Sequence, residues 1–134
     1  MSHYRPTDEA EIRGLIQNWA KAVRNRDLDA ILANHSPEIL MFDVPAPAQS
    51  KGIDAYRKTW ESFFGWAQDV GMFDIKELDI TAGSDLAFAT ALMRCGGIEP
   101  NGKKAELDFR LTVCLRKIDG HWTVMHEHHS VPAT

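Results

Sequence analysis

Apolar residues recur at helical spacing near the start of the chain. Three acidic residues follow Pro6 and Thr7, and the apolar positions after them fall on one stripe: Ile12, Leu15, Ile16, Trp19 and Val23. This pattern predicts an amphipathic helix with its acidic residues in the first turn. The helix is expected to end near Arg24 and Arg26, because cations suit the C-terminal end of the helix dipole.

Two further helices are predicted before the period changes. Asp27 can cap a short helix over residues 28–34, which Ser36 and Pro37 would end. Gly52 begins a third helix and Gly65 ends it. The apolar side of this third helix is formed by Ile53, Tyr56, Trp60, Phe63 and Phe64.

From about Val70 onward the hydrophobic period is two, which predicts strands. The alternation flips parity near Lys76 and Glu77, and such a flip indicates a β-bulge. Small alanines form one face of the next strand, and the opposite face carries Leu86, Phe88, Leu92 and Arg94. Helices followed by an antiparallel meander predict one α+β domain, residues 1–134, with the helices against one face of the sheet.

Asp119-Gly120 is a strong signal for a two-residue hairpin turn. Residues that pair across the turn share a face, so the helix-covered face is expected to carry Phe109, Leu111, Val113, Leu115, Trp122 and Val124. By the same alternation, His126 and His128 point into this face. A one-residue slip or a bulge near the strand end would exchange them with Glu127 and His129.

Asp43 ends an apolar run and is followed at once by prolines. Proline stops ladder pairing, so Asp43 is expected at the end of a buried strand. Desolvation at such an apolar mouth disfavours the charged form of a carboxylate, which makes Asp43 a candidate general base. The alternative is that Asp43 opens the Pro-rich turn through hydrogen bonds between its side chain and the backbone.

Two histidines and one arginine complete the candidate polar site. His126 and His128, at the open end of an apolar face, fit a polar patch at the bottom of a pocket. Arg94 extends from a face that is otherwise apolar, and a buried arginine needs an anionic partner. That partner is either a ligand group or a structural carboxylate such as Asp108 or Glu106.

Composition and charge exclude several classes of function. The chain has 134 residues and a net charge of −4 with no basic block, which argues against nucleic-acid binding. We see no apolar stretch long enough for a signal peptide or a membrane span. Cys95 and Cys114 lie in strand-like segments rather than in a disulfide framework, so a reduced, cytoplasmic protein is expected.

The chain also resembles a known superfamily. Asn18-Trp19-Ala20-Lys21-Ala22 through Asp27-Leu28-Asp29, followed by Asp43 and Gly52, resembles the ketosteroid isomerase pattern. The ending from Asp119-Gly120-His121-Trp122 to Val131-Pro132 looks like the SnoaL-like group. It is also similar to the association domain of the calcium/calmodulin-dependent kinase. All belong to the nuclear transport factor 2-like superfamily, and the resemblance implies a conical α+β barrel of three helices on a strongly curved sheet with a pocket inside.

The resemblance has limits at the catalytic donors. Ketosteroid isomerase holds its developing enolate with a tyrosine hydroxyl and a protonated acid. Trp19 matches the tyrosine position. The position of the protonated acid falls within residues 109–113, where the inward side chains are all apolar. Steroid isomerisation is therefore not the expected reaction.

We expect a cofactor-independent isomerase or cyclase that removes a proton alpha to a carbonyl. Asp43 would be the base, and His126 and His128 would donate to or reprotonate the enolate oxygen. Arg94 would anchor an anionic substrate group; the ligand is expected to be a small apolar or anionic carbonyl compound. The pocket would be lined by Trp19, Tyr56, Trp60 and Val113. The alternative is a non-catalytic ligand-binding or association module, and a weaker one is a metal site of His126, His128 and Asp43.

The outer sheet face predicts self-association. It combines an apolar middle with a charged rim, as interface patches do. We expect a homodimer through a patch made of Thr112, Cys114, Thr123 and Met125, flanked by Arg110, Arg116, Glu127 and His129.

Overall fold

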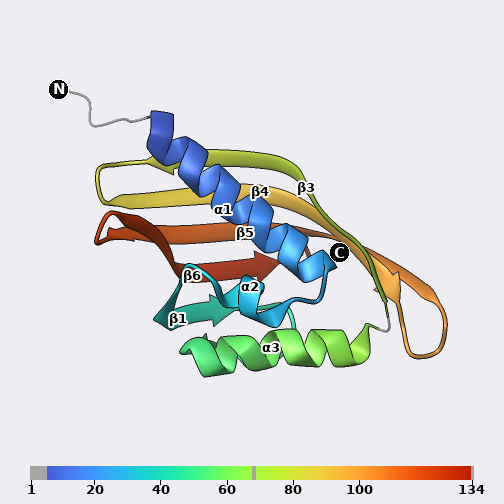
Figure 1. Cartoon of the computed structure of the whole chain (residues 1–134). Helices are drawn as coiled ribbons and strands as arrows, with labels where there is room; N and C mark the ends of the chain where they lie inside the picture. Colours follow the sequence, from blue (N-terminus) through green and yellow to red (C-terminus); the bar gives the residue numbers. More distant parts are fainter. Residues whose placement is uncertain (1–5, 68, 134) are drawn as a thin grey trace.

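The computed structural model describes residues 6–67 and 69–133 and shows helices on one face of a curved sheet (Figure 1). The helices are α1 (Pro6–Arg24), α2 (Leu28–Leu32) and α3 (Ile53–Trp66). The strands are β1 (His35–Phe42), β2 (Ser50–Lys51), β3 (Asp69–Ala82), β4 (Leu86–Ile98), β5 (Lys104–Ile118) and β6 (His121–Ser130). The sheet order is β2-β1-β6-β5-β4-β3, with β1 and β6 parallel and the other neighbours antiparallel. The predicted α+β class, with three helices on a mostly antiparallel sheet, is confirmed.

Helix α1 buries the predicted stripe against the sheet. Ile12, Ile16 and Val23 are almost fully buried. The start of the helix is fixed by Asp8, whose Oδ1 accepts hydrogen bonds from Lys117 Nζ at 2.9 Å and from the Trp122 indole at 3.1 Å. None of the helices in the described part of the chain combines the length and apolar character needed to cross a bilayer.

The chain between α1 and α3 positions the second layer of helices. Asp27 caps α2 as predicted, because its side chain accepts a hydrogen bond from Ala30 N. The helix ends at Leu32, earlier than predicted, because Asn34 adopts a positive φ of 62° and its carbonyl accepts from Val124 N on β6. Arg26 donates to the carbonyl oxygens of Phe64 and Ala67 at 2.8 Å. It thereby holds the C-terminal end of α3, where carbonyl groups lack helical partners.

The predicted bulge in β3 is confirmed, since the pairing with β4 skips a residue between Ile75 and Glu77. The expected burial of the β4 face that carries Arg94 is wrong. Ala89 and Ala91 pair with Val113 and Leu111, so the small residues face the helices. The larger side chains face outward, and Leu86, Phe88 and Leu92 are 58%, 50% and 46% exposed.

The β5–β6 hairpin follows the predicted register as far as Val124. Asp119 and Gly120 have φ angles of 51° and 81°, the positive values that a type I′ turn requires. Leu115 pairs with Val124, but Cys114 pairs with His126, so Met125 is an extra residue in β6. This β-bulge reverses the parity of every later residue in the strand. Glu127 and His129 are therefore buried on the inner face, and the predicted inward orientation of His126 and His128 is wrong.

Candidate functional site

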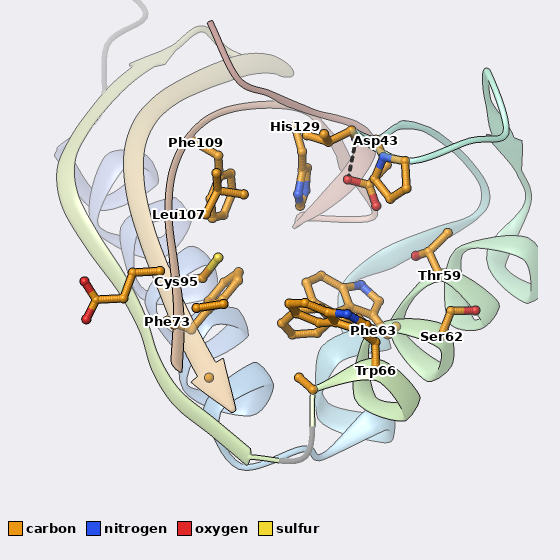
Figure 2. Close-up of a pocket in the computed structure, with 18 residues that line it drawn as sticks. Asp43, Thr59, Ser62, Phe63, Trp66, Phe73, Cys95, Leu107, Phe109 and His129 are labelled. Atoms are coloured by element: carbon orange, nitrogen blue, oxygen red, sulfur yellow. Dashed lines mark hydrogen bonds between the residues drawn. The ribbon is translucent and has the colours of Figure 1, made fainter. Parts of the chain in front are cut away.

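A cavity of about 560 Å³ lies between the concave face of the sheet and α3 (Figure 2). This volume is in the range of roughly 300–1,000 Å³ that is typical of small-molecule sites. Its walls are mostly apolar and include several aromatic rings, because α3 contributes Trp60, Phe63 and Trp66 while the sheet contributes Phe73 and Phe109. The rings pack edge-on or tilted against one another, for example Trp60 and Phe73 with centroids 5.9 Å apart. Such walls favour a flat, apolar ligand.

Asp43 lies on the pocket wall, directly after the end of β1. It is half-buried, and its Oδ1 accepts a hydrogen bond from Val44 N at 2.8 Å. The structure therefore contains both features considered for this residue, because Asp43 opens the Pro-rich turn and also lines the cavity. No hydrogen bond to its Oδ2 occurs within residues 6–67 and 69–133. Geometrically, Oδ2 is available to a ligand.

His129 lines the pocket beside Asp43 (Figure 2). Phe42 on β1 pairs with His128 on β6. The residues that follow them, Asp43 and His129, are therefore brought close together by neighbouring strands. The His129 ring is 6% exposed and stacks on Phe109 with a ring-centroid distance of 5.5 Å. Its Nε2 lies 3.1 Å from Glu127 Oε2. The sequence indicated that a bulge near the end of this strand would bring His129 inside. Whether the bulge occurs, and at which residue, depends on how the strand pairs in three dimensions.

His126 and His128 lie on the opposite face of the sheet from the pocket. His126 Nδ1 contacts the carbonyl oxygen of Leu40 at 2.6 Å, and both rings pack edge-on against Phe42. They do not converge with Asp43, which lines the inner face. The three residues therefore do not form the metal set considered from sequence. Within the described residues, no group of three or more histidine, cysteine or acidic side chains is placed to hold a metal ion.

A buried polar cluster lies behind His129. Glu127 Oε1 accepts a hydrogen bond from the Tyr56 hydroxyl at 2.8 Å and lies 2.7 Å from His35 Nε2. The Trp19 indole N–H donates to the Tyr56 hydroxyl at 3.0 Å. These residues come from α1, β1, α3 and β6, so the cluster ties the helices to the sheet. Glu127 and His35 were missed as functional candidates, because neither belongs to a local motif.

The cluster controls the charge of its members. Burial alone raises the pKa of Glu127, but hydrogen bonds from His129 and His35 and the charge of His35 outweigh it and lower the pKa to about 2. Burial, followed by the charge of Glu127, raises the pKa of Tyr56 well above its usual value. Glu127 is thus an ionised acceptor and Tyr56 is a neutral donor.

Arg94 does not reach the pocket, so its predicted inward orientation is wrong. Its guanidinium donates to Asp108 at 2.9 Å and also to Glu106, on the outer side of the neighbouring strand. The hydrogen bonds that Arg94 donates to Asp108 and Glu106 raise the pKa of Arg94. The structure shows the alternative considered from sequence, in which Arg94 pairs with these two carboxylates. The physical reason is the register, because Arg94 pairs directly with Asp108 on the face opposite the buried alanines.

The other expected lining residues divide between the wall and the layer behind it. Trp60 lines the cavity, whereas Trp19, Tyr56 and Val113 are buried but do not line it. Trp19 contacts Trp60, Phe73 and His129 and so supports the wall from the α1 side. Cys95 also lines the cavity, and burial raises the pKa of its thiol, which disfavours the reactive thiolate.

Comparisons with known proteins agree with this architecture. The SnoaL-like domain family matches residues 12–134. A solved NTF2-like protein from Pseudomonas putida KT2440 has 37% sequence identity and a TM-score of 0.86, covering 97% of this chain and 90% of its own. A search of curated proteins gave no match.

More distant solved structures share the fold. A ketosteroid isomerase-like protein from Erwinia carotovora atroseptica SCRI1043 has 20% identity and a TM-score of 0.80, covering 93% of this chain and 96% of its own. The association domain of C. elegans CaMKII has 16% identity and a TM-score of 0.74, with coverage of 93% and 96%. The extent of the family match and the identity to the P. putida protein show that this chain belongs to the SnoaL-like domain family of NTF2-like proteins.

Proposed function

We propose that this protein is a small-molecule enzyme in which Asp43 removes a proton from the carbon next to a carbonyl group. One observation carries the proposal: Asp43 is a half-buried carboxylate on the wall of an aromatic-lined cavity. Low polarity around a carboxylate strengthens it as a base toward a bound C–H acid. Family membership alone does not fix an activity, because the fold hosts both enzymes and binding modules.

The proposed chemistry moves only a proton. The Asp43 carboxylate accepts the alpha proton, and the electron pair of the C–H bond moves into an enolate. If the proton returns to a different carbon, the product is an isomer. If the enolate carbon instead attacks a second carbonyl of the same ligand, that carbonyl becomes an alkoxide, which takes the proton back from Asp43, and the product is a ring. Neither route needs a cofactor, because no electron is gained or lost.

The lining favours a neutral ligand over an anionic one. Asp43 contributes negative charge, and no lysine or arginine occurs among the described residues that line the cavity. Arg94, the expected anchor for an anionic group, instead forms ion pairs with Asp108 and Glu106 on the outer face of the sheet. We therefore narrow the ligand class to apolar carbonyl compounds with an aromatic or fused-ring body.

A deuterium-exchange screen tests the proposal. The protein is incubated in heavy water with neutral aryl ketones and 1,3-diketones, and with aryl keto acids of matched size. Alpha-deuterium incorporation is followed by mass spectrometry. We expect exchange above the buffer rate for neutral ketones and slower exchange for the keto acids. Absence of exchange with every neutral ketone that binds in the pocket contradicts the proposal.

Two variants make the screen specific to the pocket. Asp43→Asn keeps the size of the side chain and removes the base, so exchange should fall by roughly 10²- to 10⁴-fold. His128→Gln is the matched control, because His128 is exposed on the outer face and should leave the exchange rate unchanged. Circular dichroism checks that both variants remain folded.

A non-catalytic binding module is the second candidate. It is favoured by the exposed apolar side chains on the outer sheet face, which suit association rather than catalysis. This candidate predicts that ligands saturate the pocket and quench the fluorescence of Trp60 and Trp66, while no bound ketone exchanges its alpha protons.

We also propose that the protein forms a homodimer through this outer face. The observed patch differs from the expected one, because Glu127 and His129 are buried inside and Phe88 and Leu92 are exposed instead. These side chains lie beside Cys114 and Arg110 of β5, which gives an apolar centre next to a charged rim. Such a composition is typical of interfaces between copies of one chain.

A cytoplasmic location is proposed on separate grounds. Cys95 and Cys114 are both free thiols in the structure, which suits a reducing compartment. Fractionation of cells that express the tagged protein tests this, and recovery of the protein outside the cytoplasmic fraction would refute it.

A further inference from the structure

The buried cluster fixes the protons on His35. Its Nδ1 lies 2.8 Å from the carbonyl oxygen of Ala33, which can only accept a hydrogen bond. Its Nε2 lies 2.7 Å from Glu127 Oε1, which also accepts when the carboxylate is ionised. Both ring nitrogens therefore act as donors, and His35 is an imidazolium cation. Its charge balances that of Glu127 in a region where the two side chains are 1% and 2% exposed.

The remaining oxygen of Glu127 determines the state of His129. Glu127 Oε2 lies 3.1 Å from His129 Nε2, so this nitrogen must carry the hydrogen that is donated. The charge of Glu127 is already paired with His35, so His129 need not be a cation to satisfy the carboxylate. No hydrogen bond to His129 Nδ1 occurs within the described part of the chain, and the ring is part of the pocket wall (Figure 2).

We propose that Glu127 holds His129 as the tautomer protonated on Nε2, so that the unprotonated Nδ1 faces the pocket as a second proton carrier beside Asp43. His35 is a positioning residue in this arrangement, because it supplies the counter-charge that keeps Glu127 an acceptor. Tyr56 and Trp19 complete the support by donating along the chain Trp19–Tyr56–Glu127.

The role of His129 in catalysis rests on the proposed function of Asp43. Asp43 accepts the alpha proton and becomes a neutral acid. No direct hydrogen bond joins Asp43 and His129 in the described part of the chain, so the proton passes through a bridging water molecule to Nδ1 of His129. His129 becomes an imidazolium and Asp43 is left ionised. The imidazolium returns the proton to the enolate at a second carbon, whose new C–H bond uses the enolate electron pair. His129 thus takes the reprotonating role that the sequence assigned to His126 and His128.

Nitrogen-15 NMR of the histidine rings tests the tautomer without any substrate. Long-range spectra of the uniformly labelled protein near neutral pH distinguish protonated from unprotonated ring nitrogens. His35→Gln and His129→Gln variants assign the two rings. We expect His129 with a proton on Nε2 alone and His35 with protons on both nitrogens. A proton on Nδ1 of His129, or a neutral His35, overturns the proposal.

Two variants of the cluster separate charge from packing. In Glu127→Gln the side-chain amide can donate to Nε2, so the proton of His129 should move to Nδ1. Tyr56→Phe removes one hydrogen bond to Glu127 but keeps its charge, so the tautomer should stay unchanged. If Glu127→Gln does not fold, the wild-type and Tyr56→Phe spectra still decide the matter. An unchanged tautomer in folded Glu127→Gln, or a changed one in Tyr56→Phe, counts against the proposal.

An activity measurement then tests the catalytic role separately. With a ketone that the wild-type protein exchanges, Glu127→Gln should lower kcat by roughly 10²- to 10⁴-fold with little change in KM. The pH profile of kcat should also change shape, which a loss of packing alone would not cause. If the spectra show the expected tautomer but Asp43→Asn exchanges normally, the proposed function fails while the tautomer assignment stands. If Asp43→Asn is inactive and His129→Gln is fully active, the relay fails alone.

Discussion

At the scale of single residues, Glu127 and Asp43 are carboxylates in opposite circumstances. Glu127 is fully buried and accepts hydrogen bonds from Tyr56, His35 and His129, so both of its oxygens are already paired within the protein. Asp43 is half-buried and accepts one backbone hydrogen bond, so an oxygen remains for a ligand. We therefore propose a positioning role for Glu127 and a proton-transfer role for Asp43, although both are carboxylates.

The lowered pKa of Glu127 has a consequence for stability. Its folded value of about 2 lies below the usual 4.5, so ionised Glu127 stabilises the fold above about pH 4.5, and this stabilisation is lost as the pH falls toward 2. A shift of this size corresponds to about 3 kcal/mol. Urea unfolding across this range should show that the free energy of unfolding falls more for wild type than for Glu127→Gln, which lacks this one titrating carboxylate.

Tyr56→Phe is the control for this measurement. It retains the carboxylate and should keep the steep dependence on pH, although the missing hydroxyl costs about 1–2 kcal/mol at every pH. Parallel curves for wild type and Glu127→Gln would show that Glu127 is not held ionised by the cluster.

At the scale of secondary-structure elements, local patterns predicted most of the fold. The helix stripe, the Asp27 cap, the β3 bulge and the Asp119-Gly120 turn all depend on neighbouring residues, and all were found. The bulge at Met125 was not placed, because its position depends on how β6 pairs with both β5 and β1. That single residue moved Glu127 and His129 into the interior and His126 and His128 out of it.

The faces of β4 show a second limit of local patterns. Its large residues indicated a core face, yet they are exposed and the alanines are buried. The register with β5 decides this, since Ala91 pairs with the buried Leu111. Asp43, by contrast, directly follows a strand as expected, because a strand end followed by prolines is a local signal.

Close approach of β3 and β4 at the pocket edge gives a prediction for Gly97. A Cβ atom there would lie 2.3 Å from the carbonyl oxygen of Asp69, and backbone cannot move aside easily. Gly97→Ala should lower the free energy of unfolding by about 1–3 kcal/mol. Gly14→Ala is the comparison, because nothing lies within 4 Å of its added methyl and alanine favours a helix interior. It should raise stability by about 0.5–1 kcal/mol.

Thermal unfolding of both glycine variants measures these changes. An equal response at the two positions would mean that the approach of Asp69 to Gly97 does not constrain the backbone.

At the scale of the whole molecule, the two faces of the sheet differ in character. Its inner face, covered by the helices, holds the pocket and the charged cluster, and its outer face exposes Phe88 and Leu92. Burying the outer face in a dimer would leave the pocket mouth free, so association and ligand binding need not compete.

Substitution of Phe88 tests the dimer. Light scattering of the wild type should give twice the chain mass of 15.1 kDa at micromolar concentration. Phe88→Glu, which places a charge at the centre of the patch, should give the monomer mass. Trp66→Glu is the matched control, because Trp66 is also exposed but belongs to α3 on the other side of the sheet. A wild-type monomer, or a Phe88→Glu dimer, would contradict the proposed interface.

The most direct test of the account is the rate of alpha-deuterium incorporation into one neutral aryl ketone by wild type and Asp43→Asn. Both proteins must bind the ketone with similar affinity, shown by quenching of Trp60 and Trp66. We predict that the wild type exchanges the bound ketone well above the buffer rate and that Asp43→Asn loses roughly 10²- to 10⁴-fold of this rate. Equal exchange rates for the two proteins at equal occupancy would show that Asp43 is not the base.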